Sequence, residues 1–179
     1  MEKYLACICE GGAERAIMDL LLDNHMLIFE REDLIDEEVL KCRKGKEFEE
    51  KYLRKGFSEK VIVYRILDSY SENFKLSKAY KHKVDVINII TSPEIEMLII
   101  CSEGKYEEFK KFANKNAEGK PSTYCKSRLG YKNVKKYEFI QEYFSEINRL
   151  VNALHEYRRV TKQLSLIHIS EPTRPRLIS

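Results

Sequence analysis

Residues 3–22 read KYLACICEGGAERAIMDLLL and contain a short apolar run, an abrupt Glu-Gly-Gly break and a helical pattern. The run at residues 4–9 is apolar without alternation, which predicts a strand covered on both faces. From Ala13 onward the apolar residues follow the spacing of an amphipathic helix. Because ligands in open α/β sheets bind outside the carboxyl ends of strands, Glu10 is a candidate site residue. Its carboxylate also has a purely structural explanation, since it favours the positive end of the following helix.

The composition indicates a single domain and excludes several classes of protein. The 179 residues are enough to bury a core. A formal net charge of +3 is too balanced to indicate nucleic-acid binding by itself. Five cysteines, without a CxxC pair or a His/Cys cluster, support neither a zinc site nor a disulfide framework. We therefore expect buried thiols in a reducing cytoplasm and, since no apolar run approaches a membrane span, no membrane partner.

The end of the sequence differs from everything before it. Residues 164–179 read LSLIHISEPTRPRLIS, with two prolines, few charges and no regular period. The first eleven of these residues resemble the translation of a sequencing adapter. We therefore expect residues 1–163 to form one domain, truncated at its C-terminus, and residues 164–179 to be a non-native tail.

Two further apolar runs predict strands. They are KVIVYRILD at residues 60–68 and KVDVINIIT at residues 83–91, both rich in β-branched residues. Pro93 then marks a turn, and the acidic, proline-led start of the apolar segment at residues 97–101 favours a helix there. Strands that alternate with helices predict an α/β domain with a mainly parallel, Rossmann-like sheet flanked by helices.

The remaining segments give weaker patterns. Residues 26–29 are a short apolar run that predicts a second strand. Residues 30–60 are densely charged, and their apolar stripes predict one or two surface helices. Residues 119–131 contain two glycines and a proline and are typical of a loop, whereas residues 134–157 carry one long helical period.

Three acidic residues follow predicted strands: Glu10, Asp68 and Glu96. Parallel strands end at one edge of a sheet, so we expect these carboxylates to converge there. Converging carboxylates repel one another unless a cation neutralises them, and a set of oxygen ligands suits Mg²⁺ or Mn²⁺. Such ions activate water and stabilise the charge of an in-line phosphodiester attack. Alternatively, Asp68 caps a turn and Glu96 is an ordinary first-turn helix acid.

Three short segments, in this order along the chain, resemble the motifs of Toprim-like domains. CEGGAE at residues 9–14 resembles the first motif and ILD at residues 66–68 the second. SPEIEMLI at residues 92–99 is similar to the N/S-P-x-F/I-E-x-W-L segment of the RloB, AbiL and OLD-nuclease-like branch. The resemblance covers residues 3–157. It implies a Toprim-like sheet and a Mg²⁺- or Mn²⁺-dependent nuclease of DNA or RNA in bacterial phage defence and abortive infection.

The resemblance also implies roles for individual residues. Glu10 becomes a metal ligand or general base, Asp68 a metal ligand and Glu96 a further acid near the metal. Lys126 becomes a contact of the scissile phosphate, although ordinary solvation in a loop explains it equally well. The chain departs from the family pattern at Tyr70, which stands where Toprim enzymes have the second acid of Asp-x-Asp.

Two other functions remain open. Tyr70 favours a catalytically degenerate Toprim-like scaffold that binds nucleic acid or a partner ATPase from the same locus. The Gly-Gly turn before a helix is also typical of small-nucleotide binders, but Gly-Gly alone is not a phosphate-loop motif.

Overall fold

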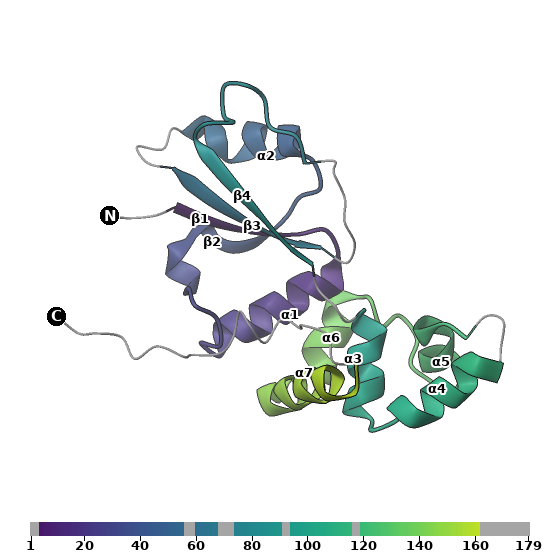
Figure 1. Cartoon of the computed structure of the whole chain (residues 1–179). Helices are drawn as coiled ribbons and strands as arrows, with labels where there is room; N and C mark the ends of the chain where they lie inside the picture. Colours follow the sequence, from purple (N-terminus) through teal and green to yellow (C-terminus); the bar gives the residue numbers. More distant parts are fainter. Residues whose placement is uncertain (1–3, 56–59, 68–73, 91–93, 116–118, 162–179) are drawn as a thin grey trace.

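A computed structural model describes residues 4–55, 60–67, 74–90, 94–115 and 119–161 of the chain. Within these residues four parallel strands form one sheet in the order β2-β1-β3-β4 (Figure 1). The strands are β1 (Tyr4–Cys9), β2 (Leu34–Lys41), β3 (Val61–Leu67) and β4 (Val84–Ile90). The predicted α/β fold with a parallel sheet flanked by helices is thus confirmed, and its arrangement is consistent with a Rossmann-like or Toprim-like fold.

Each face of the sheet packs on a separate apolar core. Ala6 and Ile8 of β1 pack on one face with Phe48 of α2 (Gly45–Lys51). Cys7 and Cys9 lie in the other core, together with α1 (Gly12–Asp23). Figure 1 shows α2 and α1 on opposite sides of the strands. The absence of alternation in β1 follows from this double coverage, because both faces of the strand are removed from water.

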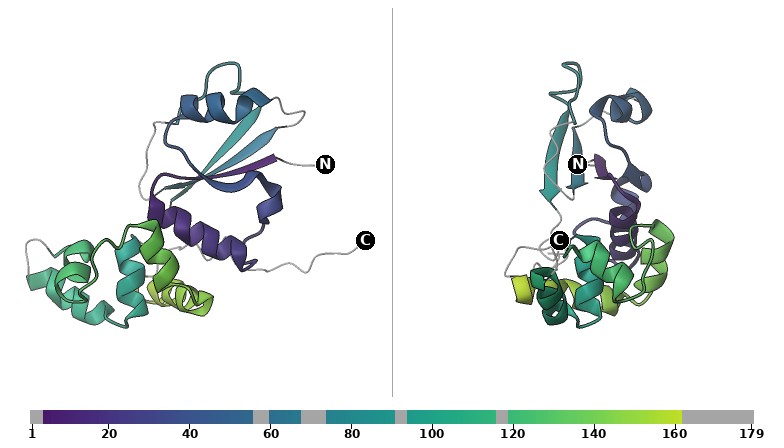
Figure 2. Two further views of the ribbon diagram at one scale, coloured as in Figure 1. Left: turned by 180° about the vertical axis from the view of Figure 1, so that it is seen from behind. Right: turned by 90° about the vertical axis from the view of Figure 1, so that its right-hand side faces the viewer.

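Five further helices form a layer beside α1, at one end of the molecule (Figures 1 and 2). They are α3 (Ile95–Ser102), α4 (Tyr106–Lys115), α5 (Pro121–Ser127), α6 (Tyr137–Tyr143) and α7 (Ile147–Thr161). Helix α6 packs on α1, and α3 packs on both α7 and α5. Buried residues of this layer, such as Ile140 and Leu150, belong to the same core as Cys7 and Cys9. The helical layer and the sheet therefore share one core.

Four local predictions are wrong. Residues 26–29 form no strand, and the second strand of the sequence is β2. Within residues 30–60, the predicted helical stripe at residues 34–40 belongs to β2, whereas the stripe that begins at Phe48 does belong to a helix, α2. The loop predicted at residues 119–131 contains α5, which begins at Pro121. The long helix predicted at residues 134–157 is divided into α6 and α7.

Two short 3₁₀ helices, η1 (Arg31–Asp33) and η2 (Leu53–Lys55), complete the described elements. All five cysteines are buried and unpaired, as expected. None of the helices in the described ranges combines the length and the hydrophobicity needed to cross a bilayer. Residues 164–179, the expected non-native tail, lie outside the described residues.

Candidate functional site

The carboxyl ends of the strands lie at one edge of the sheet, as predicted. Cys9 at the end of β1 pairs with Ile66 of β3, and Ile66 pairs with Ile89 of β4. Glu10 directly follows β1 at this edge. Asp68 directly follows β3 in the sequence but lies outside the described residues.

The turn after Glu10 lies against the helical layer. A Cβ atom at Gly12 would lie 3.5 Å from the backbone nitrogen of Tyr137 and 3.7 Å from the backbone oxygen of Lys135. The first turn of α1 therefore lies against the segment that leads into α6. These are ordinary van der Waals distances, so a Cβ atom at Gly12 would meet no steric conflict there.

Glu10 is held by a buried arginine. Nη2 of Arg65, on β3, donates to Oε1 of Glu10 at 3.1 Å, and Nη1 donates to Oδ1 of Asn88 at 3.0 Å. The guanidinium also stacks over the ring of Phe74, 4.6 Å from its centroid. The side chain of Arg65 is only 3% exposed, whereas that of Glu10 is 26% exposed. Burial lowers the pKa of Arg65 from its ordinary value, and the Glu10 carboxylate opposes this shift. An arginine still keeps its charge, so Glu10 is a counter-ion of Arg65.

Glu96 is buried at the start of α3. The residue is 1% exposed, and its Oε1 lies 3.4 Å from Nζ of Lys135, an exposed lysine. Its Oε2 has no hydrogen-bond partner among the residues that the structure describes. A buried carboxylate oxygen without a partner is unfavourable, because it has lost its hydration without replacement. Such a group is a candidate for binding a ligand.

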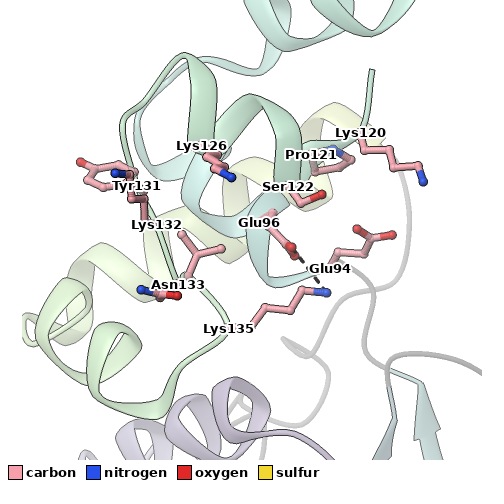
Figure 3. A pocket seen from close by; sticks show the side chains of 11 residues that line it. Glu94, Glu96, Lys120, Pro121, Ser122, Lys126, Tyr131, Lys132, Asn133 and Lys135 are labelled. Carbon is pink, nitrogen blue, oxygen red and sulfur yellow. Dashed lines mark ion pairs between the residues drawn. The ribbon is translucent and has the colours of Figure 1, made fainter. Parts of the chain in front are cut away.

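Glu96 lines an open pocket of about 660 Å³ (Figure 3). Lys126 and Ser122 of α5 line the same pocket, so the structure brings two of the four predicted site residues together. The pocket also has three lysines that the sequence analysis did not select, and one further glutamate. These residues are Lys120, Lys132, Lys135 and Glu94.

Glu96 interacts with Cys125, a buried residue of α5. The thiol of Cys125 donates to the backbone oxygen of Glu96 at 3.6 Å. Burial, with the Glu96 carboxylate as a second cause, raises the pKa of Cys125 to about 12. The thiol is therefore neutral at physiological pH and does not compete with Glu96 for cations.

The predicted metal ligands do not form a complete set within the described ranges. No group of three or more His, Cys, Asp or Glu side chains is arranged there to hold a metal ion. Glu10 is not among the residues that line the pocket of Glu96. The chemistry of the donors nevertheless suits a hard cation, because Glu96 offers an unpartnered oxygen and Glu10 is partly exposed.

Arg65 and Lys135 were not predicted from the sequence. A charged residue inside the apolar run VIVYRIL was a detectable signal for Arg65, since a buried charge requires a partner. Lys135 gave no comparable signal, because its partner Glu96 lies in a different part of the chain.

Comparisons of the chain with protein-family models, curated proteins and solved structures found no match.

Proposed function

We propose that this chain is a Mg²⁺-dependent, Toprim-like nuclease that hydrolyses phosphodiester bonds of DNA or RNA. The observation that carries the proposal is the pocket of Glu96, where a buried carboxylate with an unpartnered oxygen faces four lysines. Lysines suit a phosphate, and an unpartnered carboxylate oxygen suits a hard cation. The role in bacterial phage defence rests on the resemblance to the RloB, AbiL and OLD-nuclease-like branch. Five unpaired thiols favour the cytoplasm as its location.

In this proposal Glu10, Asp68 and Glu96 hold Mg²⁺ or Mn²⁺. When bound, the ion activates water and neutralises charge at the phosphate. Lys126 contacts the phosphate that is cleaved. Lys135 orients Glu96 through its contact with Oε1 and leaves Oε2 for the ligand.

Arg65 has a positioning role in the proposed site. Its hydrogen bonds to Glu10 and to Asn88 join the edge of the sheet to β4. Because the guanidinium is buried and stacked on Phe74, it holds the Glu10 carboxylate in one orientation. A carboxylate fixed in this way loses little side-chain entropy when it binds a cation.

The same ion pair favours the second candidate function, a scaffold without catalytic activity. A cation at Glu10 must share its carboxylate with Arg65, and Tyr70 replaces one acid of the second motif. A site with one carboxylate fewer binds its metal more weakly. Such a scaffold binds nucleic acid or a partner ATPase and cleaves nothing.

Cleavage assays distinguish the two functions. Supercoiled plasmid and tRNA are incubated with the protein and Mg²⁺ or Mn²⁺, with EDTA as the blank. The nuclease proposal predicts cleavage that Glu10→Gln and Asp68→Asn abolish, whereas Glu138→Gln, an exposed acid of α6, cleaves normally. Activity that survives both site substitutions removes these residues from the mechanism. No cleavage, together with no metal binding in calorimetry even when nucleic acid is present, favours the scaffold.

A further inference from the structure

The positive charge of the chain is concentrated in one segment. Residues 105–136 contain nine lysines and one arginine but only three glutamates, a formal charge of +7. The whole chain carries +3, so the other residues together carry −4. The small net charge therefore conceals a strongly basic part of the molecule, which coincides with α4, α5 and the segment before α6.

Most of this charge is not neutralised in the folded protein. Glu107 and Glu108 pair with Lys110 and Lys105 on the same helix, at 3.6 and 2.6 Å. Seven other cations of the segment form no ion pair with a described residue, and all seven are exposed. One of them, Lys136, is the N-cap residue of α6. We call the other six the α4–α5 basic surface: Lys111, Lys115, Lys120, Lys126, Arg128 and Lys132.

Two hollows adjoin α5. One is the pocket of Glu96, to which α5 contributes Lys126. The other has a volume of about 270 Å³ and is lined by three cations, Lys111, Lys115 and Arg128, by the rings of Phe112 and Tyr124, and by Glu108. Glu108 is paired with Lys105, so the three cations outweigh it. The guanidinium of Arg128 lies 5.8 Å from the centroid of the Phe112 ring. The cations therefore extend from the candidate site across α5 to a second hollow.

We propose that the α4–α5 basic surface binds the phosphate backbone of the nucleic acid that enters the site of Glu96. The inference rests on the proposed function for the identity of its ligand and adds the surface that holds the substrate. A ligand that contacts both hollows must carry charges along its length, as the backbone of a nucleic acid does. The partly exposed ring of Phe112 also suits an unstacked base, whereas Tyr124 is buried. Contacts to the backbone position the strand without reading its sequence.

The test measures binding in EDTA, where cleavage does not interfere. Fluorescence anisotropy follows labelled duplex DNA, single-stranded DNA and RNA over a range of salt concentrations. Lys111→Glu with Lys115→Glu reverses two charges in the second hollow, away from the residues assigned to catalysis. Lys78→Glu with Lys81→Glu is the matched control, because both lysines are exposed but lie between β3 and β4. If the first variant fails to fold, Lys111→Gln with Lys115→Gln replaces it.

The logarithm of the binding constant falls as the logarithm of the salt concentration rises. The proposal predicts that this dependence becomes shallower in the variant, with the magnitude of the slope for duplex DNA smaller by about two, while the control keeps the slope of the wild type. Two lost phosphate contacts correspond to about 60-fold weaker binding at about 0.1 M salt. Equal affinity of the variant and the control for the labelled nucleic acids would overturn the proposal. Competition by polyglutamate as effective as that by DNA also overturns it, in favour of an acidic protein partner. Binding without cleavage by the wild-type protein in Mg²⁺ refutes only the nuclease function.

Discussion

Replacing Glu96 by methionine should make the protein more stable, although Glu96 is the centre of the proposed site. The residue is 1% exposed, and one carboxylate oxygen has no partner among the described residues. An unsatisfied buried polar atom costs about 1–3 kcal/mol. The compensating pair with Lys135 is weak, because that lysine is 65% exposed and water screens the attraction to about 1 kcal/mol or less.

Methionine has a similar length and needs no hydrogen bonds, so Glu96→Met should raise the free energy of unfolding by about 1–3 kcal/mol. For a chain of this size the midpoint of thermal unfolding should rise by about 3–10 °C. Urea unfolding followed by circular dichroism measures the change. The matched control, Glu138→Met, alters an exposed acid and should change stability by less than about 0.5 kcal/mol.

A loss of stability of more than about 1 kcal/mol in Glu96→Met would refute this reasoning. It would show that the Glu96 carboxylate stabilises the fold, and the main reason for assigning a ligand to the pocket would disappear. A gain would place Glu96 among residues that natural proteins keep for function at the expense of stability.

Three further predictions concern other parts of the molecule. Glu10→Ala should cost about 2–3 kcal/mol, because it removes the carboxylate that accepts from the buried Arg65 guanidinium. Glu10→Gln keeps an acceptor and should cost about 1 kcal/mol. Equal stability of both variants and the wild type in urea would contradict the role of the pair. Burial opposes ionisation of Glu103, but hydrogen bonds from Tyr143 (2.6 Å) and a second tyrosine hold its pKa below the ordinary value of 4.5. A lowered folded-state pKa adds stability above the unfolded-state value, so Glu103→Gln should cost about 1–2 kcal/mol at neutral pH. The difference from the wild type should shrink as pH falls below about 4.5, and a difference independent of pH would contradict the assignment. Cys125 should resist thiol reagents at about pH 8 until urea unfolds the protein, since burial raises its pKa to about 12; rapid modification of the folded protein would show that the thiol is accessible.

The sequence predicted the strands in which apolar residues recur along the whole length. β1 and β3 are apolar runs because these two central strands are covered on both faces. β4 is an edge strand, and its apolar run includes Ile87, which is 44% exposed. β2 was missed because its pairing with β1 is interrupted, with a shift of register after Leu5. Asp36 and Glu37 there have positive φ angles and exposed side chains, so the strand shows no alternation.

The helical errors have a similar cause. The period of residues 134–157 continues through the break between α6 and α7, because both helices bury their apolar side chains in the same core. No proline or glycine marks that break, and the helix ends with Phe144 as its C-cap. Pro121 stands at the first position of α5, where proline favours the start of a helix, although the glycines on either side are typical of a loop.

The sequence predicted individual residues of the candidate site but not the residues with which they pair. Glu96 and Lys126 do line one pocket, and Glu10 does lie at the edge of the sheet. Their partners could not be predicted, because the pairs of Glu10 with Arg65 and of Glu96 with Lys135 join segments that meet only in the folded chain.

The most direct test of the proposed function is the rate at which wild-type protein and Glu96→Gln cleave plasmid DNA and tRNA in Mg²⁺. Glutamine keeps the shape of the side chain but offers a cation only one neutral oxygen. We expect the wild-type protein to cleave at least one of these substrates and the folded variant to be slower by about 100-fold or more. Equal rates for the two proteins, or no cleavage by the wild type, would contradict the assignment of phosphodiester hydrolysis to this pocket.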